Sequence, residues 1–497
     1  MKNIKKLLCA LLVTAFVLPV FAGCTNANKQ TDLGKTPAET THPEFVIEIT
    51  SDEERIYESM PNYVFIPDDE MLGVWNAVDF VANIDDFDEG VQNYPKSELY
   101  WQNVEFFEDG TAAMNFGGRE IKCEWTKGYM VWNFSQLVPS YTVKEVNGTK
   151  HTFVEWKSED TPRYYVFKKG RTKYVNVNDD VRNRDLRNYD LVDLGKSIFT
   201  LWFNEKTRFP TDAAKMPKPE NYQPGYILET GKNPGLGVRG LHGRGITGKG
   251  VNVAIIDQPL YIDSHPEYAG KITEYKDFDC QSESSMHGPG VVSLLVGETT
   301  GTAPGAKVYY AAAPSWTGDA TYYADAIDWI VETNKNLPEG EKIRVISISA
   351  APTPSNKDWT NGKAYLESVK RAKEAGILVL DCSTENGIIG ACVYDFNNPE
   401  DVALCRTLSW AKKGILTPVQ RTTAEEYDKG DFSYQYDGEG GLSWAIPYAA
   451  GVLAMGWEIR PELTADEIVK ILSDTAYINA EGNKFIHPTA FIDYLLK

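Results

Sequence analysis

The order of apolar and polar positions divides the chain into regions of different character. From about residue 61 to residue 170, apolar and polar residues alternate in short runs separated by turn signals, including Asp109-Gly110 and Asn147-Gly148. Such dipeptides between alternating runs are strong short-range signals of a β-hairpin. The pattern therefore predicts a small antiparallel β domain over residues 61–170.

Beyond Gly225 the apolar positions form continuous runs. Four of these runs are predicted as buried strands and two amphipathic stretches as helices, over residues 251–256, 307–312, 345–348 and 377–380, and over residues 320–334 and 364–375. Apolar strands that alternate with helices indicate a parallel sheet with helices on both faces. Residues 225–497 are thus expected to form an α/β domain, and residues 171–224 a segment that connects it to the β domain.

The first residues have the character of a secretory signal. Lys2, Lys5 and Lys6 precede an apolar run over residues 7–21, which is shorter than the about 20 residues that a helix needs to cross a bilayer. Small residues follow this run, as they do at signal-peptide cleavage sites. Residues 1–23 are therefore predicted to be a signal peptide that is removed from the mature protein.

The end of this segment, Phe21-Ala22-Gly23-Cys24, resembles a bacterial lipobox. In such a motif, cleavage falls just before the cysteine, which becomes the lipidated first residue. The alternative is an ordinary signal peptide cleaved nearby, with Cys24 left unmodified. Residues 24–60 are rich in Thr, Asn, Pro and Glu and are expected to form a flexible tether. The prediction is an extracytoplasmic bacterial protein held at the cell membrane by a lipid on Cys24.

Composition and charge narrow the set of partners. The 497 residues include 70 acidic and 50 basic side chains, so the net charge is −20. This charge repels nucleic-acid phosphates and anionic lipid surfaces, which excludes nucleic acid as a partner and restricts membrane contact to the lipid anchor. Apart from Cys9 and Cys24, an odd number of cysteines remains, which leaves at least one thiol unpaired, and no C-x-x-C spacing indicates zinc. The remaining cysteines are Cys123, Cys280, Cys382, Cys392 and Cys405.

Three segments of the α/β region carry candidate chemistry. Asp257 ends a buried strand, His287 stands just before an apolar helix, and Ser443 begins a long helix with Pro447 in its first turn. Each has a structural interpretation when taken alone, since Asp forms turns at strand ends, a lone His is more often structural, and Ser is a common helix N-cap. A serine at a helix N-terminus also suits a nucleophile, because free backbone N–H groups there stabilise an oxyanion.

Taken together, these segments resemble those of the subtilisin-like serine proteases (subtilases, peptidase S8), whose catalytic residues follow the chain order Asp, His, Ser. The resemblance covers about residues 235–497 and includes residues 248–251 before the Asp and residues 303–306 after the His. It implies a subtilisin-like parallel sheet with helices on both faces, preceded by the small antiparallel β domain. It also implies a serine endopeptidase that acts on protein or peptide substrates.

The resemblance further implies a division of roles. Ser443 would be the nucleophile, His287 the general base, and Asp257 the residue that orients the imidazole. The substrate cleft would be walled by the segments near residues 347–351 and 378–383. No cofactor is required and no metal ligand is predicted. Structural calcium is frequent in the family, but no loop has the EF-hand pattern that would identify its ligands.

The chain also departs from the family pattern. The usual Asp-Thr-Gly, His-Gly-Thr and Gly-Thr-Ser sequences are altered, although all three catalytic side chains remain. The oxyanion asparagine of subtilases follows a buried strand in a Gly-Asn context. A gapless match places Glu385 at that position, whereas a one-residue shift places Asn386 there. Asn386 is the predicted oxyanion residue, and loss of such a donor costs about 2.7 to 4 kcal/mol of transition-state stabilisation.

Two functions are in competition. The first is a lipid-anchored serine endopeptidase at the outer cell surface. The second is a catalytically weak subtilase relative that binds peptides or senses envelope conditions, with the β domain as its binding module.

Gly73-Val74-Trp75, near the start of that domain, resembles the opening of lipocalin-like barrels. An esterase is disfavoured, because Ala445 stands where a Gly-x-Ser-x-Gly motif has its second glycine.

Overall fold

The structure is a computed structural model that describes residues 65–497, except 95–98, 118, 132–138, 159–160, 171–174, 188, 219–221, 409 and 411–412. For residues 119, 157, 158, 161 and 162 it describes the backbone alone. The predicted signal peptide, the lipidation residue Cys24 and the tether lie outside the described residues, so these three predictions stay predictions.

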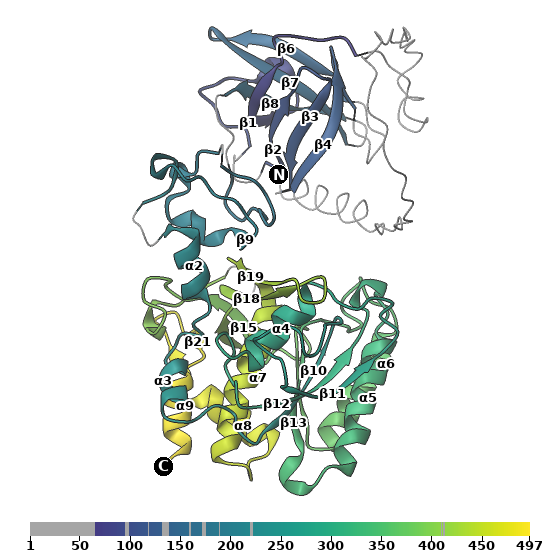
Figure 1. The fold of residues 1–497 in the computed structure, drawn as a ribbon, viewed down its shortest axis with the longest axis vertical. Coiled ribbons are helices and arrows are strands. Elements are labelled where there is room, and N and C mark those ends of the chain that lie inside the picture. The colour runs from purple at the N-terminus through teal and green to yellow at the C-terminus, as the bar shows by residue number, and fades with distance from the viewer. Residues whose placement is uncertain are drawn as a thin grey trace, which may run out of the picture. The chain divides into compact units, whose positions relative to one another are not determined.

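The first described region is an antiparallel sheet, drawn in purple and blue in Figure 1. Its strands have the order β5-β4-β3-β2-β1-β8-β7-β6, and each pairs antiparallel with its neighbours. The predicted antiparallel β region is therefore confirmed. The strands are β1 (Gly73–Val81), β2 (Trp101–Phe106), β3 (Thr111–Phe116), β4 (Arg119–Thr126), β5 (Tyr129–Val131), β6 (Tyr141–Val146), β7 (Thr149–Ser158) and β8 (Thr161–Lys169).

Turn chemistry and aromatic burial explain this sheet. The β6–β7 turn places Asn147 at a φ of 51° and Gly148 at a φ of 78°. Positive φ at both central residues defines the type I′ turn, whose twist suits a hairpin. Trp75 of β1 is 1% exposed, and its Nε1 donates to Met71 O at 2.7 Å. Other buried aromatic residues of this sheet are Trp101, Phe106, Phe116, Trp125, Tyr165 and Phe167.

A parallel sheet forms the centre of the second region. Its strand order is β11-β12-β10-β13-β14, and every neighbouring pair is parallel. All four strands that the apolar runs predicted are present, and the two predicted helices are α5 (Thr321–Asn336) and α6 (Gly362–Glu374). The strands are β10 (Asn252–Asp257), β11 (Ile272–Asp277), β12 (Lys307–Ala312), β13 (Ile343–Ile348) and β14 (Leu378–Asp381).

Further elements surround this sheet. One additional sheet has the order β16-β15-β17-β21-β20, and another has the order β18-β19-β9. The strands are β9 (Trp202–Asn204), β15 (Ile389–Val393), β16 (Arg406–Thr407), β17 (Ile415–Pro418), β18 (Arg421–Glu426), β19 (Phe432–Asp437), β20 (Tyr477–Ile478) and β21 (Lys484–Phe485). The helices are α2 (Pro224–Gly231), α3 (Val238–Gly243), α4 (His287–Val296), α7 (Gly441–Ile459), α8 (Ala465–Asp474) and α9 (Pro488–Leu495).

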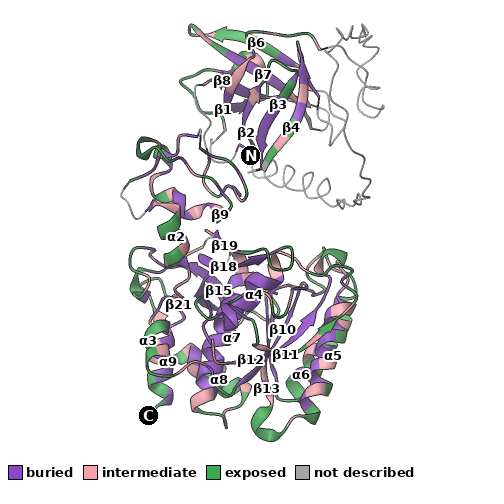
Figure 2. Ribbon diagram, viewed as in Figure 1, coloured by how far each residue is buried: buried purple, intermediate pink, exposed green. Residues whose placement is uncertain are grey.

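Alternate residues of the parallel strands face opposite layers of helices. On β10, Val253 and Ile255 share a core with α4 and α7, whereas Ala254 and Ile256 share a core with α5 and α6. Both faces are therefore apolar, which explains why the strand is a continuous apolar run in the sequence. Figure 2 shows β10 as buried and α5 and α6 with exposed outer sides. The predicted class, a parallel sheet with helices on both faces, is confirmed.

The segment predicted as a connector contributes to this second region. Its strand β9 pairs antiparallel with β19. The buried side chains Val181, Leu186 and Leu191 belong to the same core as α4 and α7. These residues therefore help to hold the hairpin of β18 and β19, which leads into α7.

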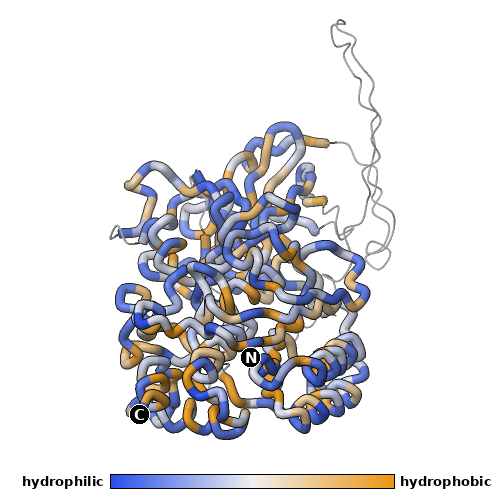
Figure 3. Tube along the Cα trace, turned by 60° about the horizontal axis from the view of Figure 1, so that its bottom comes forward, coloured by the Kyte–Doolittle hydropathy of each residue, from blue (hydrophilic) through white to orange (hydrophobic). Residues whose placement is uncertain are grey.

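Hydropathy changes sign at short intervals along the described chain. Figure 3 shows hydrophobic and hydrophilic positions succeeding each other along the helices. Within the described ranges, no helix combines the length and the apolar character needed to cross a membrane.

Candidate active site

The parallel sheet brings Asp257 and His287 together. Asp257 is the last residue of β10 and His287 is the first residue of α4, so both lie at the carboxyl end of the sheet, where such folds place functional groups. His287 Nδ1 lies 2.6 Å from Asp257 Oδ1. Ser285 fixes the start of α4, because its Oγ accepts the backbone N–H groups of His287 at 3.2 Å and of Gly288 at 3.3 Å.

Gly288 allows the start of α4 to lie close to the backbone that follows Asp257. A Cβ at this residue would lie 2.3 Å from Gln258 O, a distance that real Cβ atoms do not tolerate. The same Gln258 oxygen accepts the Tyr310 hydroxyl at 2.5 Å. The missing side chain thus lets the start of α4 pack directly on the backbone that follows Asp257.

The charges around His287 favour its protonated form. Burial lowers the pKa of His287, but the charge and hydrogen bond of Asp257 and the charge of Asp437 outweigh burial, and the pKa is raised. Asp257 is 2% exposed and also accepts the Gln258 backbone N–H at 2.8 Å. A buried carboxylate that holds Nδ1 in this way leaves Nε2 free to act as a base.

Ser443 lies in the first turn of α7, which begins at Gly441. Its backbone N–H is therefore one of those with no partner within the helix. Ser443 Oγ donates to Ser349 O at 3.2 Å, and Ser349 Oγ donates to Ser443 O at 2.8 Å. Because Ser349 directly follows β13, these bonds hold Ser443 against the carboxyl end of the central sheet.

Two residues that the sequence analysis did not single out surround these groups. The indole of Trp444 lies 5.4 Å from the imidazole of His287, measured between ring centres. The Cys382 thiol lies against the Ser443 hydroxyl, and burial together with nearby carboxylates raises the pKa of this thiol well above its usual value. The position of Trp444 directly after Ser443 was the available signal, whereas nothing local distinguishes Cys382 from the other cysteines.

Asn386 follows β14, and its amide is turned toward the backbone. Its Nδ2 donates to Val379 O at 2.8 Å, while Oδ1 is buried and has no partner among the described atoms. Val379 belongs to β14, an edge strand of the parallel sheet. One of the two Nδ2 hydrogens is thus bound to Val379 O, and the role of Asn386 as an oxyanion donor stays a prediction.

Glu385, the residue that the gapless register places at the oxyanion position, reaches across to the segment after β13. Its carboxylate accepts the hydroxyls of Thr353 and Thr384, each at 3.2 Å, and a further hydrogen bond from Ser355. The bond from Ser355 is the main reason that the pKa of Glu385 is lowered. Glu385 is exposed, so it presents an ionised carboxylate to solvent at neutral pH.

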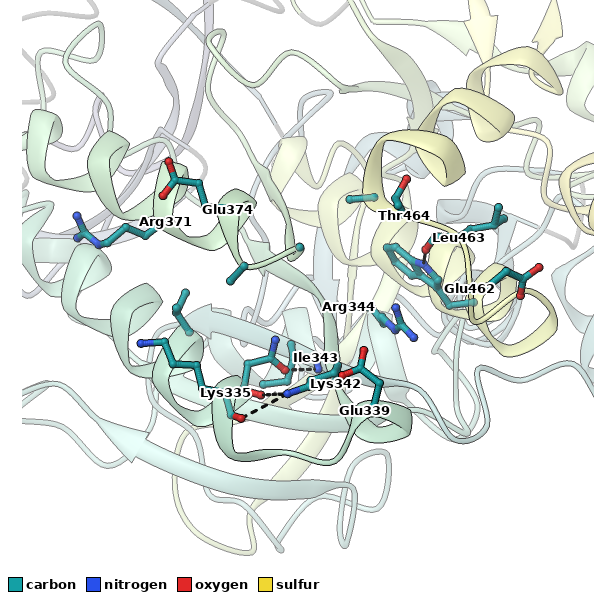
Figure 4. A pocket seen from close by; sticks show the side chains of 16 residues that line it. Lys335, Glu339, Lys342, Ile343, Arg344, Arg371, Glu374, Glu462, Leu463 and Thr464 are labelled. Carbon is teal, nitrogen blue, oxygen red and sulfur yellow. Dashed lines mark hydrogen bonds between the residues drawn. The ribbon is translucent and has the colours of Figure 1, made fainter.

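A cavity of about 660 Å³ lies at the opposite end of the sheet. Its lining includes Ile343 and Arg344, which begin β13, whereas Asp257 is the last residue of the parallel strand β10. Figure 4 shows charged side chains around it. Arg344 donates to Pro461 O at 2.8 Å, and Arg371 is paired with Asp328 at 2.7 Å, so these cations are already bound by the protein. Nowhere in the described part of the chain do three or more His, Cys, Asp or Glu side chains gather as a metal site.

Comparison with known proteins agrees with this architecture. A model of the subtilase family, Peptidase S8, matches residues 248–408. The matched range contains Asp257, His287 and Asn386 and ends before Ser443. Residues 248–408 therefore resemble a subtilase-family domain, and the second region has the subtilisin-like α/β fold that the motifs implied.

The relatives that match are proteases of low identity. Serine protease AprX of Bacillus subtilis (strain 168) is 24% identical over 279 residues, which are 47% of this chain and 62% of AprX. A thermostable alkaline protease of Halalkalibacterium halodurans is 24% identical over 269 residues, 50% of this chain and 68% of that protein. The chain thus spans less than two thirds of the length of AprX.

One solved structure that this chain resembles is that of fervidolysin from Fervidobacterium pennivorans, described as a keratinolytic enzyme related to subtilisin. The TM-score is 0.40 at 16% identity, over 56% of this chain and 49% of that one. The family match and the curated relatives support a serine protease at the level of the family.

Proposed function

We propose that this protein is a serine endopeptidase that hydrolyses peptide bonds through Asp257, His287 and Ser443. The observation that carries this proposal is the 2.6 Å contact between Asp257 Oδ1 and His287 Nδ1 at the carboxyl end of the sheet. Ser443 lies in the first turn of α7, and the next residue, Trp444, packs on the imidazole. These three side chains come from distant segments, and the described contacts gather them around one end of the sheet.

The arrangement supports acyl transfer in two stages. Ser443 Oγ attacks the peptide carbonyl carbon while His287 Nε2 accepts the hydroxyl proton. The tetrahedral intermediate expels the amine, which takes that proton from His287. Water, deprotonated by the same imidazole, then hydrolyses the acyl-enzyme and restores Ser443. Asp257 stays ionised, holds Nδ1–H and stabilises the imidazolium.

Two donors are available for the oxyanion. The Ser443 backbone N–H has no helical partner, because it lies in the first turn of α7. Asn386 would supply the second donor by turning Nδ2 from Val379 O toward the substrate. Its buried Oδ1 lacks a partner among the described residues, so the present position does not satisfy the whole amide. Ser443 must likewise release Ser349 O before attack, which costs about 1 kcal/mol.

We place this activity at the outer cell surface, with a lipid on Cys24 as the anchor and the antiparallel region as a lipocalin-like domain that recruits substrate. The lipobox resemblance supports the anchor, and the buried Trp75 of β1 is compatible with the barrel resemblance. Wild-type protein should partition into detergent, and Cys24→Ala should move it to the aqueous phase. Unchanged partitioning of the variant would count against lipidation.

A fluorophosphonate probe tests the nucleophile directly. The probe should label the wild-type protein at Ser443 and fail to label Ser443→Ala. A wild-type protein that is folded and yet unlabelled would refute the endopeptidase proposal.

The second candidate is a catalytically weak subtilase relative that binds peptides. Two observations favour it: Asn386 Nδ2 is bound to Val379 O, and the Ser443 hydroxyl donates to Ser349 O. In that case peptides should bind without being cleaved, and the probe should not react. The labelling experiment therefore separates the two candidates.

A further inference from the structure

The electrostatic field around Ser443 is built from carboxylates. In the described part of the chain, the side-chain charges that act most on His287 and Cys382 are those of Asp257, Asp381 and Asp437. Arg182, the cation that acts on Asp437, is paired with Asp180 at 2.9 Å and stacks on Trp202. A negative field of this kind attracts cationic groups and repels anionic ones.

Three of the carboxylates near this site are already bound by the protein. Asp257 holds His287, as described above. Asp381 accepts the Tyr365 hydroxyl at 2.7 Å and the Ser383 backbone N–H at 2.7 Å. Asp437 accepts two backbone N–H groups, from Glu439 at 2.9 Å and from Gly440 at 2.8 Å. The oxygens of these three carboxylates therefore bind groups of the protein itself.

Glu385 differs from these three because it is exposed. Its charge helps to raise the pKa of Asp381, so Glu385 contributes to the same negative electrostatic field. Its three hydroxyl partners leave acceptor capacity, since an ionised carboxylate has about four lone-pair positions. A cation could therefore reach it from solvent.

Glu385 also links the two segments that contact the nucleophile. The segment after β13 contacts Ser443 through Ser349, and the segment after β14 contacts it through Cys382. Farther along, Glu385 on the second segment binds Thr353 on the first. A substrate side chain that enters between these segments from Ser443 would meet the Glu385 carboxylate.

We propose that Glu385 binds the cationic side chain of the substrate residue that precedes the scissile bond, so that the enzyme prefers Lys or Arg at that position. This inference rests on the proposed endopeptidase function. One hydrogen bond between a cation and a partly exposed carboxylate should raise kcat/KM about tenfold. Salt should weaken the preference, because the carboxylate is open to solvent.

The test compares two peptides that differ only in Arg or citrulline before the cleaved bond, since citrulline keeps the shape of Arg and lacks its charge. Wild-type protein should cleave the Arg peptide about tenfold faster in kcat/KM, and high salt should reduce this ratio. In Glu385→Gln the ratio should fall close to one. The control Glu374→Gln removes an equal charge near the cavity at the opposite end of the sheet and should keep the wild-type ratio.

The outcomes separate this inference from the function on which it rests. Probe labelling with equal cleavage of both peptides by wild-type protein would overturn the selectivity. An unchanged ratio in a folded Glu385→Gln protein would overturn the assignment to Glu385. If that variant does not fold, a salt-independent wild-type ratio would overturn it instead. Absence of labelling together with absence of cleavage would overturn the endopeptidase function itself.

Discussion

The antiparallel region and the α/β region differ in how far apart along the chain their contacts lie. In the first, every pair of neighbouring strands except β1 and β8 is consecutive in the sequence, such as β2 with β3 and β6 with β7 across short turns. In the second, β10 pairs with β12 and β13, and the Ser443 hydroxyl meets Ser349, 94 residues earlier. Local turn signals therefore predict the first region except for the pairing of β1 with β8, whereas the second depends on long-range register.

This difference separates stability from chemistry. The antiparallel region buries aromatic side chains such as Trp101 and Phe167. In the α/β region, the ends of β10 and β13 and the starts of α4 and α7 bring His287 to Asp257 and Ser443 to Ser349. The comparison predicts that changes in the first region affect its own stability, while small changes at those ends affect catalysis.

The largest effect should come from the nucleophile and the base. Ser443→Ala and His287→Ala should each lower kcat by about 10⁶-fold, and the double variant should lose little more, because such residues act as one unit. The melting temperature of Ser443→Ala should stay close to that of the wild-type protein, since only a hydroxyl is removed. Peptide hydrolysis assays measure kcat, and thermal melting measures the melting temperature. Wild-type activity in Ser443→Ala, free of contaminating protease, would end the assignment.

The next effect belongs to the antiparallel region. Phe167→Ala removes a fully buried ring that lies 4.9 Å from the ring of Trp101, and it should destabilise this sheet by about 3–5 kcal/mol. Peptidase activity should be retained at temperatures below the altered transition. Calorimetry and activity assays on the same sample test this. A matched loss of activity would show that the two regions are coupled and would break the comparison.

Asn386→Ala should lower the rate by about 10²- to 10³-fold if its amide turns to the oxyanion during the reaction. The same change removes the hydrogen bond to Val379 O, so melting must be measured alongside kcat. The matched control is Asn336→Ala, because Asn336 Nδ2 also binds a backbone carbonyl, Glu332 O at 3.1 Å, at the end of α5. Full activity in Asn386→Ala would end the oxyanion assignment alone.

The smallest effect concerns the pH profile. The charge of Asp437 helps to raise the pKa of His287, and catalysis needs the neutral imidazole. Asp437→Asn should therefore move the acid limb of kcat/KM to lower pH and leave the plateau nearly unchanged, since Asn keeps an oxygen for its two backbone N–H partners. Asp431→Asn, at the other end of β19, should leave the profile unchanged. An unmoved acid limb in Asp437→Asn would contradict this account.

Much of the architecture could be predicted from local pattern. Continuous apolar runs marked β10, β12, β13 and β14, because strands covered on both faces need apolar residues at every position. Asn147-Gly148 marked the β6–β7 hairpin, because its turn needs positive φ at both residues. The order of three motif-bearing segments indicated the subtilase fold, which the family match over residues 248–408 supports.

Other features depend on which distant segments the fold brings together. The sequence by itself determined the elements and the residue types at their ends, including Asp257, His287 and Ser443. Only the tertiary structure decided that Cys382 lies against Ser443, that the amide of Asn386 turns to Val379, and that Glu385 binds Thr353. The reason is physical: hydrophobic periodicity encodes the face on which a residue lies, whereas a side chain's partner depends on the register of distant strands and on its own rotamer.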